Sequence, residues 1–151
     1  MVVMNKVTAN SVIKNLYIQN YPVHCFSISD CANVLMENIV LNNTAGNAPN
    51  AISGGLPAAH NSDGYDISTS SNFLVTSGTV LNQDDCVAVS SGNNITIQNV
   101  SLKDPSSEDV VTNFSFKYIF VSNRADRNNR CTATEATVSP LAAWAENPTT
   151  M

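Results

Sequence analysis

The sequence predicts an all-β fold, a right-handed parallel β-helix that is partial and is followed by an irregular tail. Short segments alternate apolar and polar residues, as half-buried strands do. Similar short sequence motifs recur at spacings in the low twenties of residues, or at about twice that spacing. Such spacings are typical of solenoid repeats. No segment shows a long helical period. We therefore expect one domain, with the β-helix in residues 1–99 and the tail in residues 100–151.

The strands can be followed in chain order. Residues 11–20 alternate and end at Tyr21-Pro22, a second strand begins at Phe26, and a third spans residues 33–42. One set of similar words is rich in Asn and comprises residues 15–20, 38–42 and 94–99. A second set comprises residues 26–29, 65–68 and 87–90. Asn-rich corners suit tight bends, and we expect them to stack as ladders between coils.

A long loop interrupts this rhythm between Thr44 and His60, where glycines and prolines gather. Long loops beside a site often shape a cleft, and this loop ends directly before Asn61. We interpret it as a cleft wall in preference to a passive insertion.

Two acidic clusters lie about one repeat apart. The first is Asn61-Ser62-Asp63-Gly64-Tyr65-Asp66, and the second is Gln83-Asp84-Asp85-Cys86. Residues one rung apart in a β-helix are separated by about 4.8 Å, so Asp63 should meet Asp84 and Asp85. Carboxylates this close cannot ionise independently, and at least one pKa should be raised. Neighbouring strand residues face opposite sides, so Asp84 and Asp85 share the patch only if the backbone turns or bulges there.

These clusters resemble the N-T/S-D-G-F/Y-D and Q-D-D-C motifs of glycoside hydrolase family 28, the fungal and plant polygalacturonases. The resemblance covers about residues 5–99, is strongest to secreted fungal endopolygalacturonases, and implies a pectin-lyase-like solenoid. It implies inverting hydrolysis of α-1,4-galacturonan in pectin without metal or cofactor, by a secreted monomer. Asp84 matches the family's proton donor, and Asp63 and Asp85 match the pair that activates water.

Other residues near the motifs have supporting or structural interpretations. We expect Asn61, Asp66 and Gln83 to bind substrate or support the site, although Asn61 and Asp66 could instead hold turns. His24 and His60 have no motif support, so we expect them to be structural or solvent-facing.

Composition excludes several partners. The net charge of −5 and the absence of basic runs disfavour nucleic acid and anionic membranes, and no apolar run approaches membrane-spanning length. The start lacks the features of a signal peptide, whereas four glycosylation sequons and the family's secretion suggest a missing leader.

The four cysteines lack the paired spacing of a zinc site. Cys25 and Cys31 either bridge locally or are buried free thiols. The resemblance implies a bond from Cys86 to a cysteine in the next coil, but Cys131 is the next cysteine in the chain.

The tail departs from the family's pattern, which expects a segment with a partner cysteine and a G-H-G histidine after residue 99. When residues 131–151 are back-translated, the degenerate codons can encode that family segment in a different reading frame. We hypothesise that residues 100–130 translate a retained intron and that the rest is out of frame. The alternative is a genuine divergent extension.

Three functions stay open at this point. The chain is a truncated pectin hydrolase, a catalytically dead solenoid that binds glycans, or a gene-model artefact. The family's G-H-G histidine and R-I-K cations have no in-frame match, so we expect this chain to be inactive or unstable as it stands. A related hydrolase of rhamnogalacturonan belongs to the first class.

Overall fold

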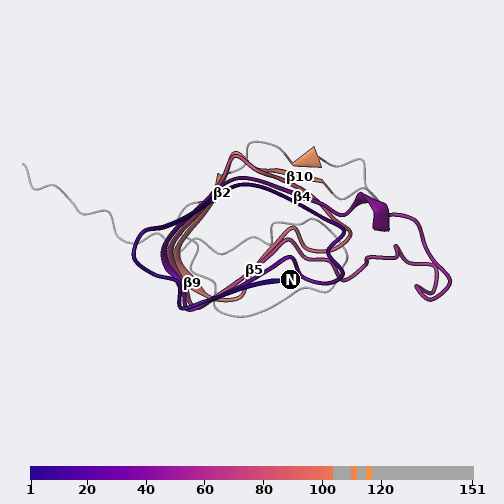
Figure 1. Ribbon diagram of the computed structural model, residues 1–151, viewed down its shortest axis with the longest axis horizontal. Coiled ribbons are helices and arrows are strands. Elements are labelled where there is room, and N and C mark those ends of the chain that lie inside the picture. Colours follow the sequence, from indigo (N-terminus) through magenta and orange to yellow (C-terminus); the bar gives the residue numbers. More distant parts are fainter. Residues whose placement is uncertain (104–109, 112–114, 117–151) are drawn as a thin grey trace, which may run out of the picture.

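The computed structural model describes residues 1–103, 110–111 and 115–116 and confirms a parallel β-helix (Figure 1). Its chain passes through successive coils, and equivalent strands stack in parallel register. In chain order the elements are β1 (Val2–Asn5), β2 (Ser11–Gln19), β3 (Phe26–Ser29), β4 (Ala32–Asn42), the 3₁₀ helix η1 (Thr44–Gly46), β5 (Tyr65–Ser68), β6 (Ser70–Thr76), β7 (Thr79–Leu81), β8 (Val87–Val89), β9 (Gly92–Gln98), β10 (Ser101–Lys103), β11 (Val110–Val111) and β12 (Ser115–Phe116).

The strands form two sheets. The smaller has the order β1-β3-β5-β8 and is parallel throughout. The larger has the order β11-β10-β7-β4-β6-β9-β12, with β2 also pairing with β4. The long strand β4 pairs along its first part with β6 and along its last part with β7, both in the next coil. Phe26 pairs with Tyr65 and Tyr65 with Val87, so the second set of repeated words is confirmed as structurally equivalent.

The first set of words was grouped incorrectly. Asn15 and Asn38 stack on each other, but Asn94 stacks on Asn72, which stacks on Asn33. The words look alike because each coil has two bends, and Asn with a positive φ occupies both kinds of bend. Asn adopts this left-handed conformation more readily than most residues. The expected ladders are confirmed, with amide-to-amide distances of 2.9 Å for one and 3.0 and 2.8 Å for the other.

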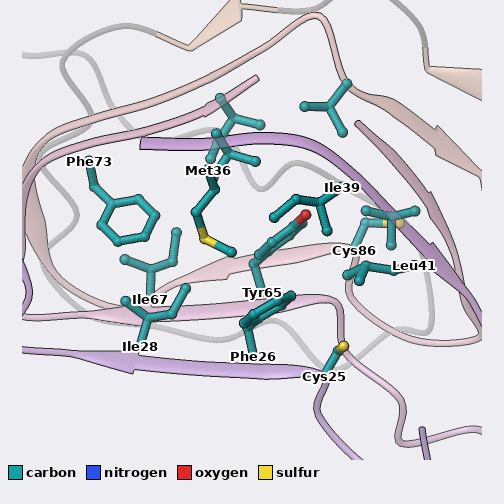
Figure 2. Close-up of a cluster of buried hydrophobic side chains, with 14 of the residues drawn as sticks. Cys25, Phe26, Ile28, Met36, Ile39, Leu41, Tyr65, Ile67, Phe73 and Cys86 are labelled. Carbon is teal, nitrogen blue, oxygen red and sulfur yellow. The ribbon is translucent and has the colours of Figure 1, made fainter. Parts of the chain in front are cut away.

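Inward-facing side chains fill the space between the two sheets (Figure 2). The rings of Phe26 and Tyr65 stack with centroids 5.4 Å apart, and Ile67 lies above Ile28 in the same manner. All four side chains are at most 1% exposed. Burial of each such side chain stabilises the fold by about 1.5–3 kcal/mol. Every second residue of these strands therefore holds adjacent coils together.

Strand β10 lies just beyond residue 99, where the sequence predicts the end of the β-helix. It pairs in parallel with β7, and buried Leu102 continues the inward column above Val80 and Leu41. The change in sequence character after Val100 concealed this short strand. Strands β11 and β12 pair antiparallel with β10 and β9. The retained-intron and out-of-frame predictions fall almost entirely on residues outside the described part of the chain.

Cysteine predictions have a partial answer. Cys25 and Cys31 are buried free thiols rather than a local bridge, while Cys131 lies outside the described residues. Among the helices that the structure describes, none is long and apolar enough to cross a membrane.

Candidate active site

The predicted acidic clusters meet at the corner where the chain passes from the larger sheet into the smaller one. The register places Phe26, Tyr65 and Val87 in one column. Two residues earlier in each coil stand His24, Asp63 and Asp85. Backbone hydrogen bonds between coils continue to these residues. The Cys25 amide donates to the Asp63 carbonyl and the Gly64 amide donates to the Asp85 carbonyl, both at 2.8 Å.

Gly64 allows the coils to approach closely beside Asp63. A Cβ atom at this position would lie 2.4 Å from the carbonyl oxygen of Cys86 and 3.0 Å from Cγ1 of Val80. Real Cβ atoms do not come so close to a backbone oxygen, so any side chain here would push the coils apart. The glycine of the Asn61–Asp66 motif is therefore needed for the spacing between the two acidic clusters.

Asp84 and Asp85 lie in a turn before β8, as their sharing of one patch requires. The buried Asn82 side chain closes this turn by donating to the carbonyl oxygens of Ser62 at 2.6 Å and Asp85 at 3.0 Å. The Asp85 amide donates to Oδ1 of Asp84 at 2.9 Å. The backbone is therefore out of strand geometry at this pair, and the prediction of a turn or bulge is confirmed.

Gln83 is buried beneath the turn and supports it from inside. Its Nε2 donates to the carbonyl of Asn43 at 2.8 Å and to the side-chain oxygen of Asn47 in the loop. Its Oε1 accepts a bond from the Ser62 hydroxyl at 3.1 Å. This network joins the turn, the coil below it and the start of the loop, so Gln83 fixes where the two aspartates stand.

Burial raises the pKa of the clustered carboxyls, and neighbouring carboxylates add to the rise at Asp63 and Asp85. Burial raises the pKa of Asp63 to about 8, with further contributions from the charges of Asp66, Asp84 and Asp85. Burial, followed by the charges of Asp84 and Asp66, raises the pKa of Asp85 to about 6. Burial also raises the pKa of Asp84, although the Asp85 amide, His24 and His60 oppose this. The expectation that the clustered carboxyls cannot ionise independently agrees with these values.

Asp66 and His24 complete the cluster. Burial raises the pKa of Asp66, while His24 and a hydrogen bond from Asp63 oppose that rise. Nδ1 of His24 is in contact with Oδ2 of Asp66, and its Nε2 lies 3.9 Å from Oδ2 of Asp63. The sequence predicts a structural or solvent-facing His24; its imidazole is 43% exposed and also contacts the acidic cluster. Its place two residues before Phe26 is the sequence signal that could have found it.

The other predicted site residues differ in solvent exposure. Asn61 is exposed at the edge of the site, whereas Gln83 is buried under it. In the described part of the chain, the ion-pair partner of Asp63 and Asp66 is His24 rather than a lysine or arginine. The side chains of His24, Asp63 and Asp66 also offer ligand atoms within 4.8 Å of one another.

Protonatable carboxyls gathered at one corner of a parallel β-helix are an arrangement that suits a glycoside hydrolase, in which one carboxyl can donate a proton while another activates water. Comparison with known families agrees with this class. Residues 1–104 match the family described as glycosyl hydrolases family 28, and the chain belongs to that family.

Individual relatives agree with this family. A polygalacturonase of Fusarium fujikuroi is 52% identical over 99 residues, which are 66% of this chain and 26% of that protein. A probable endopolygalacturonase D of Neosartorya fischeri is 56% identical over 90 residues, 60% of this chain and 19% of its own length. An endopolygalacturonase of Emericella nidulans is 40% identical over 127 residues, 76% of this chain and 30% of that protein. The chain therefore spans less than a third of each of these relatives.

Proposed function

We propose that the site formed by this chain hydrolyses α-1,4 bonds between galacturonic acid residues of pectin, with inversion at the anomeric carbon. The observation that carries the proposal is the meeting of Asp63, Asp84 and Asp85 at one corner, where burial raises all three pKa values. The similar proteins named polygalacturonase and endopolygalacturonase support the choice of substrate.

Each carboxyl has its own role in the proposal. Asp84 donates a proton to the glycosidic oxygen, and Asp63 and Asp85 activate the attacking water. An inverting enzyme holds its acid and base about 6.5–9.5 Å apart so that the water fits between them. Bonds to Asn82 and Gln83 hold the Asp84–Asp85 turn, which supports a fixed separation.

The proton distribution of the free site adds one condition. The highest pKa, about 8, belongs to Asp63 rather than to Asp84, so Asp63 holds its proton in the free protein at neutral pH. Asp63 can accept a proton from water only after releasing its own, and Asp66 is hydrogen-bonded to it. We therefore assign Asp66 the role of taking that proton when substrate binds.

A polyanionic substrate favours a protonated site. Carboxylates at the corner repel galacturonate, and this repulsion falls as Asp63 and Asp85 take up protons. We expect substrate binding to weaken as the pH rises through about 6, where Asp85 ionises and becomes able to act as a base. The KM for polygalacturonate across pH 4–8 measures this weakening, and a KM that stays constant or falls over this interval would contradict the repulsion argument.

The loop from Thr44 to His60 is proposed as one wall of the cleft. It projects from the stacked coils and carries η1 (Figure 1). It is bonded to the site turn through Asn47 and Gln83. His60 at its end is close enough to lower the pKa of Asp84. Secretion and action as a monomer are further parts of the proposal and follow from the family resemblance.

The test is release of reducing ends from polygalacturonate. It uses the 151-residue chain and, if the transcript between the codons of Asn99 and Cys131 proves to be spliced, the spliced product as well. Turnover by either polypeptide that falls about 10²–10⁴-fold in Asp84→Asn supports hydrolysis. The matched control is Asp30→Asn, which changes an exposed aspartate outside the site and should retain activity. Saturable binding without turnover would favour the glycan-binding alternative, and absence of both would overturn both functions.

A further inference from the structure

His24 comes from an earlier coil than the aspartates it touches. It precedes β3, whereas Asp63 and Asp66 belong to the segment that enters β5 in the next coil. Its Nδ1 contacts Oδ2 of Asp66, while its Nε2 stays 3.9 Å from Oδ2 of Asp63, beyond hydrogen-bond distance. The imidazole therefore engages Asp66 directly and Asp63 only through space.

Asp66 needs this contact. Its Oδ2 atom is shielded from solvent and makes no hydrogen bond of regular geometry, and the His24 ring is the polar group in contact with it. A shielded carboxylate oxygen without a donor costs about 1–3 kcal/mol or more. The same carboxyl accepts a side-chain hydrogen bond from Asp63. Asp66 is thus held between an imidazole on one side and a protonated carboxyl on the other.

We propose that His24 is a positioning residue of this site: its Nδ1–H holds Asp66, and Asp66 in turn orients the protonated carboxyl of Asp63. The inference rests on the proposed function for its meaning in catalysis, although the arrangement itself can be tested without turnover. The arrangement needs only a proton on Nδ1, which both the imidazolium and one neutral tautomer provide.

Several titratable groups surround the imidazole. Asp63 and Asp66 face it from the next coil, and Asp84 feels its charge from the turn before β8. Cys25 follows it in the chain, and burial raises the pKa of that thiol to about 11, so it stays protonated. Carboxyls are therefore the groups whose titration should respond when His24 is replaced.

The experiment follows the titration of the Asp side-chain carboxyls by ¹³C NMR in the 151-residue chain. His24→Ala removes the donor, and the Asp66 midpoint should rise by about one pH unit or more. His24→Asn places an amide donor near the position of Nδ1, so it should restore most of the wild-type midpoint. His60→Asn is the matched control, because Nδ1 of His60 bonds to the Pro57 carbonyl at 2.9 Å, and the Asp66 midpoint should not move.

A second measurement needs no substitution. The ¹⁵N shifts of the His24 ring report which nitrogen carries the proton at neutral pH, and we expect Nδ1 to be protonated. A bare Nδ1, or an Asp66 midpoint unchanged in a folded His24→Ala protein, overturns the inference. If His24 had a merely structural role, His24→Ala and His24→Asn would lower the thermal unfolding temperature equally, and the pH midpoint of the Asp66 titration would be the same in both variants.

Catalysis provides the link to the proposed function. If polygalacturonate is hydrolysed, kcat should fall about tenfold in His24→Ala and recover in His24→Asn, with little change in KM. If no turnover is found but the titrations behave as expected, the proposed function fails and the positioning of Asp66 stands. If turnover is found and the titrations do not respond, the inference about His24 fails alone.

Discussion

Replacing Asp63 by Asn should stabilise the protein at neutral pH and leave its stability at acidic pH nearly unchanged. Burial and the neighbouring carboxylates raise the pKa of Asp63 from 3.8 to about 8 in the folded protein. The folded state therefore keeps a proton that the unfolded chain releases near pH 4. Stability conferred by this group is complete below about pH 4 and is lost as the pH rises towards 8.

The size of the effect follows from that interval. About four pH units at 1.36 kcal/mol each give an upper limit near 6 kcal/mol. The Asp63 side chain is 16% exposed and its surroundings are partly wet, so we halve this figure to about 3 kcal/mol. Asp63→Asn should thus match the wild type at pH 4 and exceed it by about 3 kcal/mol at pH 8.

Urea denaturation followed by circular dichroism at each pH from 4 to 8 measures this difference. Asp30→Asn is the matched control, since it removes an exposed aspartate outside the site and should follow the wild-type curve. A difference between Asp63→Asn and wild type that stays constant with pH would refute the reasoning, because it would mean that the Asp63 carboxyl is not held protonated by the fold.

Three further substitutions test how the site and the coils are held, each by urea denaturation. Gly64→Ala should cost about 1–3 kcal/mol or more, because its Cβ would meet the Cys86 carbonyl, and a cost below 0.5 kcal/mol would show that the coils are not in close contact there. Gln83→Leu should cost about 1–3 kcal/mol by leaving buried partners without bonds, and an unchanged stability would exclude the network as a support. Asn72→Ala should cost about 1–2 kcal/mol, and more than the same change at Asn94, because Asn72 makes two ladder bonds at a positive φ of 49°; equal costs would contradict this account.

Much of the fold could be predicted because inward and outward residues alternate in short segments. The motif shared by residues 26–29, 65–68 and 87–90 predicts the observed register, since its first and third residues face the core, fully buried in the first two segments and partly buried in the third. The Asn-rich words misled, because two bends in one coil use the same residue type. Asn is chosen for its backbone conformation, and backbone conformation alone does not identify which bend a word belongs to.

The site was predictable to a different extent. Asp63, Asp84 and Asp85 could be brought together from sequence because one repeat separates the two motifs. His24 could not be predicted as a neighbour of the site, because its segment carries no motif. Only the strand register places it beside Asp63. Buried bonds of Gln83 to Asn43 and Asn47 were likewise hidden, since they cross from the turn to the start of a loop whose path the sequence does not specify.

The loop between β4 and β5 has a consequence for how such proteins diversify. From Phe26 to Tyr65 the chain uses 39 residues for one coil, whereas from Tyr65 to Val87 it uses 22, yet both pairs stand in the same column. An insertion that leaves and re-enters at one corner adds little loop-closure entropy, although Asn47 near its start is bonded to Gln83 under the site turn. The part of the loop beyond Asn47 can therefore change in length and sequence while the coils that carry the aspartates keep their register.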